Sequence, residues 1–335
     1  MEHSATAPGV RLALTGDVML GRLVDGALAR FGPAYPWGDV LPLLRAADLT
    51  ILNLECVIAA QGRPWRRWPK TFHFRAAPVA IEALTLAGVD AVSLANNHVL
   101  DFEVEALLEM LDRLDAAGIA HAGAGRSLEE AMRPAVLDAR GLRVGLVGLT
   151  DNEPGWRATE AAPGTFHVPV SLEPGTFGQV EAALAAARAA GCAFVILSAH
   201  WGPNMRERPP AEFRAFARAA IDAGADLFLG HSAHIWQGVG VHRGRPIFYD
   251  AGDFVDDYAV DPWLRNDRSA LVQVTVAERA VAAVELIPVV IDNCQVNLAW
   301  GAEAGAIAAR IVDLSAEFGT RFERRGEGLA LVGLD

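Results

Sequence analysis

The sequence predicts a single α/β domain, because strand-length apolar runs alternate with helix-period stretches and no low-complexity linker interrupts them. The runs are apolar on both faces, as expected for strands buried within a sheet. They cover residues 11–15, 49–53, 91–94, 144–149, 194–198, 227–229 and 246–249. Helical periodicity occupies 78–87, 103–116, 179–190 and 211–223. This alternation indicates helices on both faces of the sheet.

The C-terminal part continues the same domain. Residues 270–276 and 280–290 have the pattern of a β-hairpin, and 302–318 that of a closing helix. We therefore expect one domain over 1–335, with a motif-bearing core at 10–255 followed by the hairpin and closing helix at 268–335. A basic and aromatic stretch at 62–74 lies between strand and helix signals and is predicted to be a loop.

Composition limits the possible functions. Of 335 residues, 52% are apolar and 21% charged, and the net charge is −12. An acidic surface repels phosphate backbones, so nucleic acid is not an expected partner. The cysteines Cys56, Cys192 and Cys294 are scattered, which predicts neither a zinc knuckle nor a disulfide framework and fits a reducing compartment. No signal-peptide pattern or run of about 20 apolar residues is found, so we expect a cytoplasmic protein that does not enter membranes.

Residues that can bind metals or move protons follow the buried strands, just beyond their C-terminal ends. In open α/β sheets this edge binds ligands. Each residue alone has a simpler explanation, since an Asp after Gly is usually a turn or a helix cap. Five such strand ends at one edge are difficult to assign to chance, and imidazole and carboxylate together suit Mn, Fe or Zn. The residues are Asp17, Asn53, Glu55, Asn97, His98, His200, His231 and His234.

The motifs that carry these residues resemble those of the CapA family, the poly-γ-glutamate capsule synthesis proteins. They run in order from about residue 11 to 255: LTGDVMLG at 14–21, NLE at 53–55, SLANNH at 93–98 with Asp101, HWG at 200–202, and GH at 230–231 with His234 and Gln237. The family belongs to the calcineurin-like metallophosphatase superfamily. The resemblance implies a two-sheet β-sandwich flanked by helices, with a site for two metals at the sheet edges.

The resemblance also implies a role for each matched residue. Asp17 and His234 would hold the first metal, Glu55 would bridge both metals, and Asn97, His200 and His231 would hold the second. His98 would donate a proton to the leaving group. Asp101, three residues further on, could hold the His98 imidazole in the required tautomer.

Three positions depart from the family pattern. Met19 stands where the superfamily usually has the histidine of an Asp-x-His motif, so we expect a mononuclear or weakly loaded site. CapA relatives usually have Glu-Tyr after His-Trp-Gly and Gly-Asn-Phe near residue 253. This chain has 203–205 PNM and Asp253 instead. These changes indicate a different substrate.

Further residues are candidates for substrate binding, each with a simpler alternative. Trp201 and Trp236 adjoin predicted ligands, although loop tryptophans often only pack against a sheet. Arg66 can pair with a carboxylate or phosphate, although a solvated loop explains it equally. Asn53 and Asp253 lie beside the motifs, the latter in an acidic stretch that is either a solvated loop or a wall of the site.

Three functions remain open from the sequence. The first is a metal-dependent phosphoesterase or related hydrolase acting on a small phosphate ester. The second is the making or processing of poly-γ-glutamate, an acidic peptide substrate. The third follows CapA-like proteins of peptide natural-product clusters, which resemble metal-independent epimerases. The same polar residues would then remove and return an α-proton, and no metal would be needed.

Overall fold

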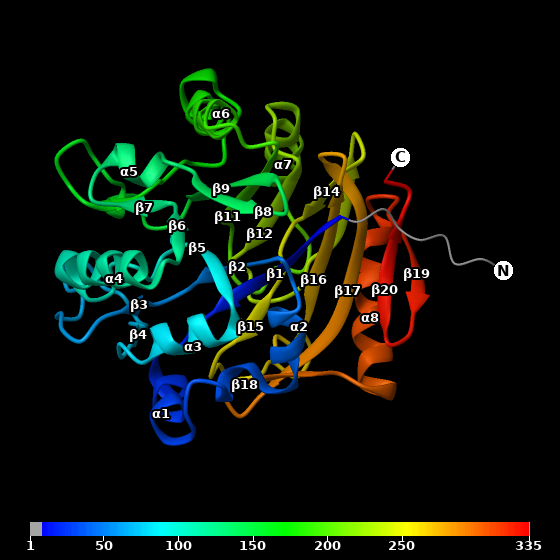
Figure 1. The fold of residues 1–335 in the computed structure, drawn as a ribbon, viewed down its shortest axis with the longest axis horizontal. Coiled ribbons are helices and arrows are strands. Elements are labelled where there is room, and N and C mark those ends of the chain that lie inside the picture. The colour runs from blue at the N-terminus through cyan, green and yellow to red at the C-terminus, as the bar shows by residue number, and fades with distance from the viewer. Residues whose placement is uncertain (1–8, 335) are drawn as a thin grey trace.

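The computed structural model describes residues 9–334, in which two large sheets pack face to face (Figure 1). The ten-stranded sheet has the order β19-β20-β17-β16-β1-β2-β5-β6, with β15 beside β1 and β18 beside β17. Its strands are β1 Val10–Val18, β2 Leu49–Leu54, β5 Val89–Ser93, β6 Ala120–Ala122, β15 Asp253–Val255, β16 Arg268–Ala277, β17 Ala280–Asp292, β18 Gln295–Leu298, β19 Arg321–Arg325 and β20 Gly328–Val332.

The second sheet has six strands in the order β13-β14-β12-β11-β9-β8. They are β8 Ala135–Ala139, β9 Leu142–Thr150, β11 Phe194–His200, β12 Leu227–His231, β13 Val239–His242 and β14 Arg245–Phe248. Two small pairs complete the strands of the described chain: β3 Val57–Ile58 with β4 Arg75–Ala76, and β7 Ala124–Gly125 with β10 Gly164–Thr165.

Helices cover the outer faces of both sheets. Figure 1 shows α3 and α4 on one side of the molecule, and α6 and α7 on another. The helices are α1 Arg22–Phe31, α2 Leu41–Arg45, α3 Ala80–Ala87, α4 Glu103–Ala117, α5 Leu128–Met132, α6 Pro174–Ala189, α7 Ala211–Asp222 and α8 Gly301–Ala316, with 3₁₀ turns η1 Tyr35–Val40 and η2 Pro154–Trp156.

Alternate residues of the central strands serve different cores, which is why these strands read as continuous apolar runs. In β1, Leu12 and Leu14 face the core between the sheets, whereas Ala13 belongs to the core under α3 and α4. In β11, Ile196 faces the inter-sheet core and Val195 the core under α6 and α7. The predicted sandwich flanked by helices, as in the calcineurin-like metallophosphatase fold, is confirmed.

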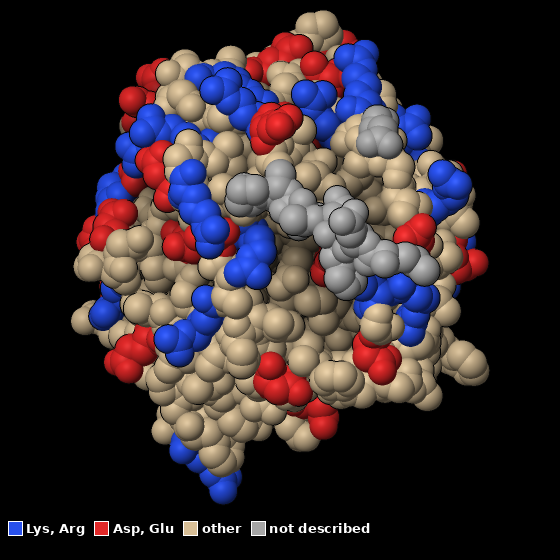
Figure 2. Space-filling view, turned by 45° about the vertical axis from the view of Figure 1, so that its right-hand side comes forward, with Lys and Arg blue, Asp and Glu red and all other residues tan. Residues whose placement is uncertain are grey.

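The predicted hairpin is β16 and β17, and the predicted closing helix is α8. The terminal hairpin of β19 and β20 was not predicted from the sequence. Cys56, Cys192 and Cys294 are free thiols, as predicted. None of the helices in residues 9–334 has the length and hydropathy to cross a bilayer. On the face drawn in Figure 2, acidic and basic side chains are interspersed, without an extended patch of one sign.

A close backbone approach places β15 against the end of β1. The backbone N–H of Asp17 donates to the carbonyl of Gly252 over 2.9 Å, and Asp17 is the register partner of Asp253. A Cβ atom on Gly16 would lie 1.8 Å from that same carbonyl oxygen. Glycine at position 16 therefore allows residues 252–253 to reach the strand end.

Replacing Gly16 with Ala should therefore destabilise the protein. The methyl group must push β15 away from β1, and forced overpacking costs about 1–3 kcal/mol or more. We expect Tm to fall by about 4 °C or more in a thermal scan. Gly26→Ala is the matched control, because its Cβ meets no atom in the exposed middle of α1 and should stabilise the helix slightly. An unchanged Tm in Gly16→Ala would contradict the close approach.

Candidate metal centre

The C-terminal ends of strands from both sheets bring the predicted ligands together. Asp17 lies near the end of β1, and His200 and His231 end the neighbouring parallel strands β11 and β12. Glu55 follows β2, and His234 lies in the turn after β12 with a φ of +60°. Parallel strands align the ligands at one edge within each sheet, and the packing of the two sheets brings these edges together.

The first group that could hold a cation consists of Asp17, His200 and His231, which are all buried and offer ligand atoms within 4.8 Å of one another. Asp17 Oδ1 lies 3.4 Å from His231 Nδ1 and 3.6 Å from His200 Nδ1. Ser198 Oγ lies 2.8 Å from His231 Nε2 and fixes that ring. Burial lowers the pKa of His200 to about 3, so this imidazole is neutral at pH 7, the form that binds metals.

The second group consists of Asp17, Glu55, His234 and Asp253, again with ligand atoms within 4.8 Å. Asp17 Oδ2 lies 3.6 Å from His234 Nδ1, and Asp253 Oδ1 lies 2.8 Å from the same nitrogen. Glu55 Oε1 lies 3.9 Å from His234 Nε2. Asp17 thus belongs to both groups, with one oxygen facing each.

Electrostatics in this region favour a bound cation. Burial, together with the charge of Asp17, raises the pKa of Glu55 well above its usual value. Burial and the neighbouring Asp256 do the same for Asp253. Burial alone would raise the pKa of Asp17, but the facing His200 and His231 hold it well below its usual value. Buried carboxylates this close together repel one another unless a positive charge lies between them.

Buried polar atoms without partners support the same interpretation. Glu55 Oε1, His200 Nε2, Asn97 Oδ1 and Asp253 Oδ2 have no hydrogen-bond partner in the described part of the chain. Unsatisfied buried polar atoms are costly and rare in folded proteins. Glu55 Oε1 and His200 Nε2 are 3.8 Å apart, a separation expected for two atoms bound to one cation at about 2.1 Å. The donors present therefore fit a divalent metal ion.

The two asparagines of the ANNH motif have different roles. The Asn96 side-chain amide donates to Asn53 Oδ1 over 3.1 Å and to the Leu54 carbonyl over 2.8 Å, which links the motif to β2. Asn97 lines the same cleft as His98 and His234, and its amide oxygen has no hydrogen-bond partner among residues 9–334. Asn97, rather than Asn96, is thus the amide available to a metal.

Met19 lies outside both groups. It is fully buried, and its sulfur accepts a hydrogen bond from the Gly21 backbone N–H. Asp253, which was predicted to contact substrate, instead belongs to the second group. The register of β15 against β1 places it beside Asp17, so that group contains four potential ligands without a histidine at position 19.

Asn53 also differs from the prediction of a substrate contact. It is fully buried at the end of β2. Its amide nitrogen lies 2.7 Å from Asp17 Oδ1 and 3.5 Å from His200 Nδ1. Asn53 therefore orients ligands of the first group, as hydrogen-bond partners around metal sites commonly do.

His98 and Asp101 form a dyad beside the two groups. His98 Nδ1 lies 2.6 Å from Asp101 Oδ2, and His98 Nε2 lies 3.7 Å from Glu55 Oε1. The His98 ring stacks on Phe74 with centroids 4.0 Å apart. Burial and the charge of Lys70 lower the pKa of His98 well below its usual value. Burial raises the pKa of Asp101 to about 7.

The cleft that His98 and His234 line has a volume of about 620 Å³. Two cationic side chains line it. Lys70 Nζ binds the Asn97 carbonyl over 2.7 Å and is almost buried, and the Arg22 guanidinium lies 5.5 Å from the centre of the Phe74 ring. Tyr258 donates from its hydroxyl to Glu55 Oε2 over 3.2 Å. Sequence patterns assign no role to Arg22, which begins α1, or to Lys70, which lies in a loop; only the folded chain brings both to the cleft.

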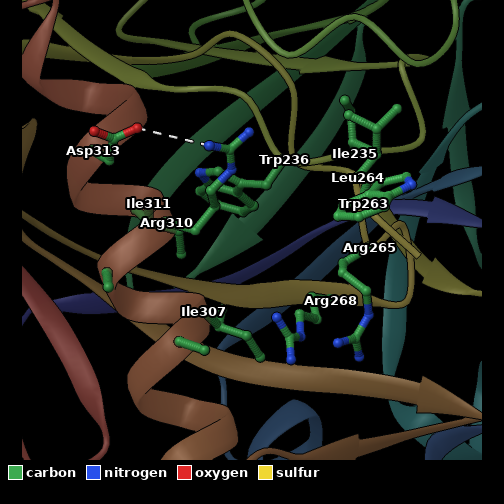
Figure 3. A pocket seen from close by; sticks show the side chains of 12 residues that line it. Ile235, Trp236, Trp263, Leu264, Arg265, Arg268, Ile307, Arg310, Ile311 and Asp313 are labelled. Atoms are coloured by element: carbon green, nitrogen blue, oxygen red, sulfur yellow. Dashed lines mark ion pairs between the residues drawn. The ribbon is translucent and has the colours of Figure 1, made fainter. Parts of the chain in front are cut away.

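Three predicted substrate contacts lie outside the cleft. Trp201 is buried in the core under α7, where its indole N–H donates to the Tyr249 carbonyl and its ring packs on Phe228. Trp236 lines a separate pocket of about 340 Å³ between α8 and residues 263–268, where Figure 3 shows it near Arg310. Each tryptophan follows a ligand in sequence, but its side chain points away from that ligand.

Arg66 is the third. It is exposed and lines a groove with other arginines rather than the cleft. In the loop that carries it, residues 69–72 and 74 line the cleft, whereas residues 60–64, 66 and 67 line the groove.

The two-sheet fold is of the metallophosphatase-like kind, and a buried cluster of histidines and carboxylates lies at its strand ends. Residues 11–258 match the family described as bacterial capsule synthesis protein PGA_cap. The chain belongs to this family.

Similar proteins include the capsule biosynthesis protein CapA of Bacillus anthracis, 28% identical over 84% of this chain and 67% of that protein. A probable polyglutamine synthesis accessory protein of Mycobacterium tuberculosis is 30% identical over 96% of both chains. Among solved structures, a hypothetical protein from Thermus thermophilus has a TM-score of 0.50 at 16% identity, covering 83% of this chain and 98% of that one. The last likeness concerns the fold alone.

Proposed function

We propose that this protein is a metal-dependent hydrolase that acts on an anionic substrate, either a phosphate ester or an acidic peptide. The observation that carries the proposal is the pair of ligand groups that share Asp17, with an unshared His98–Asp101 dyad beside them. A purely structural cluster would not need buried donors that lack partners and face one another.

The residues divide the chemical work. Asp17, Glu55, Asp253, His234, His200, His231 and Asn97 would hold one or two divalent ions, with Mn, Fe or Zn suited to this donor set. Such ions supply an activated water and neutralise developing negative charge.

The cleft supplies the remaining functions. Lys70 and Arg22 offer positive charge to an anionic substrate. His98 exposes Nε2 toward the cleft while Asp101 fixes Nδ1, so the imidazole can give a proton to a leaving group. An anion placed beside Nε2 would raise the low pKa of His98, because it favours the imidazolium form.

The test joins elemental analysis of the purified protein to a p-nitrophenyl phosphate assay with and without added manganese. We expect bound transition metal and turnover that is lost on chelation and restored by manganese. Hydrolysis of poly-γ-glutamate, followed by chain length, tests the acidic peptide as substrate. A protein that binds no divalent metal after equilibration would contradict the proposal.

Peptide epimerisation is the second candidate. The observation that favours it is that two imidazoles, His98 and His234, approach Glu55 Oε1 within 3.7 and 3.9 Å. Two proton-carrying groups around one position could remove and return an α-proton. Metal-independent entry of solvent deuterium at a peptide α-carbon would support this candidate over hydrolysis.

A further inference from the structure

A second concave surface carries an unusual concentration of positive charge. This groove, of about 1100 Å³, is lined by Arg63, Arg66, Arg67 and Arg75, with Glu103 and Glu105 on its other wall. Of the four arginines, only Arg67 forms an ion pair with a residue in the described range 9–334, to Glu103 at 3.0 Å. In a chain with a net charge of −12, three unpaired guanidinium groups in one groove call for an anionic ligand.

Aromatic rings hold two of the four guanidinium groups in place, that of the paired Arg67 and that of the unpaired Arg75. Arg67 lies over the Trp65 ring at 4.7 Å, and Arg75 lies over the Phe102 ring at 4.5 Å. Trp65 is buried beneath the loop, and its backbone N–H donates to the Asp101 carbonyl. Cation–π contacts of this kind restrict the guanidinium orientation, so less entropy is lost when a ligand binds.

The groove adjoins the cleft, because the same two chain segments line both. Phe74 faces the cleft and stacks on His98, and the next residue, Arg75, faces the groove. Likewise His98 lines the cleft, and Glu103 on the same short segment lines the groove. The groove and the cleft are therefore lined by nearby residues of the same two chain segments.

We propose that this groove binds the carboxylate groups of an acidic polypeptide, so that one unit of the polymer reaches the cleft. The proposal rests on the proposed function in the form in which the substrate is an acidic peptide. Guanidinium groups pair with carboxylates through two parallel hydrogen bonds. None of the groove-lining residues is aromatic, so the groove has no stacking surface of the kind that binds single-stranded nucleic acid.

The test is the affinity of the manganese-loaded full chain for fluorescently labelled poly-γ-glutamate, measured by anisotropy at low salt. The double variant Arg63→Glu with Arg66→Glu should bind at least about 10-fold more weakly, because two attractions become two repulsions. Arg63→Ala with Arg66→Ala should give a smaller loss. Both losses should shrink at high salt, since screening weakens exposed charge pairs.

The matched control is Arg321→Glu with Arg324→Glu, which makes the same charge change at exposed positions of β19. It should bind the polymer like the parent protein. Equal losses in the two double variants, or no loss in the groove variant, would overturn the proposal. A single-stranded oligonucleotide of equal charge that binds more tightly than the polymer would also overturn it. Failure of the proposed function is seen separately, as absence of metal-dependent turnover in the parent, whereas polymer binding is measured directly.

Discussion

Replacing Asp17 with Asn should remove the metal from both ligand groups. Asp17 Oδ1 faces His200 and His231, and Asp17 Oδ2 faces His234, so the loss of this one carboxylate affects each group. Its pKa is held low by the facing histidines, so it is ionised and ready to bind a cation at neutral pH. We expect bound manganese to fall close to zero after equilibrium dialysis. Turnover should fall by more than the roughly 10–100-fold that even outer partners of metal ligands contribute.

Asp253→Asn separates the two groups. Asp253 belongs only to the group that contains Glu55 and His234, so its loss should lower the metal content without abolishing it. Asp313→Asn is the matched control, because the Asp313 carboxylate lies on α8 in the separate pocket of Figure 3. This variant should bind as much metal as the parent protein. A parent-like metal content in Asp17→Asn would show that Asp17 is not a shared ligand. Equal losses in Asp17→Asn and Asp253→Asn would show that the two groups are one site.

The strand-end residues could be predicted from the sequence because their placement depends only on topology. Once 11–15 with 49–53, and 194–198 with 227–229, are recognised as parallel buried strands, the residues that follow each pair must meet at one edge of their sheet. The packing of the two sheets against each other then brings the two edges together. The roles within the site depend on more than topology. Asp253 joins the second group through the register of a three-residue strand against β1, which a Gly at position 16 permits. No periodicity in the sequence encodes that contact.

Trp201 does not line the cleft, because adjacency to a ligand in sequence does not fix the direction of a side chain. Successive side chains of a strand point to opposite faces, so a residue next to a ligand normally points away from it. Trp201 follows His200 and enters the core under α7 accordingly. Closeness in sequence is equally uninformative in a loop. Arg66 and Lys70 are four residues apart, yet Lys70 lines the cleft and Arg66 lines the groove.

Replacing His98 with Ala should slow hydrolysis by ~10²–10⁴-fold, the usual contribution of a positioned general acid. Metal content should stay at the parent level, because His98 belongs to neither ligand group. The loss should be smaller for substrates with good leaving groups, since these need less protonation. Asp101→Asn should weaken the positioning of the imidazole and shift the pH profile of turnover, which a purely structural role would not do.

The matched control is His242→Ala, which removes another histidine paired with an aspartate, 2.8 Å from Asp222 on the surface, and should leave turnover unchanged. The same His98 variant separates the two candidate reactions. In an epimerase, chelation would leave activity intact, and His98→Ala would slow the entry of solvent deuterium at the substrate α-carbon. In a hydrolase, chelation abolishes turnover and no deuterium enters. If His98→Ala kept full activity on both phosphate esters and acidic peptides, His98 would have a structural role only. Its position 3.7 Å from Glu55 would then not contribute to catalysis.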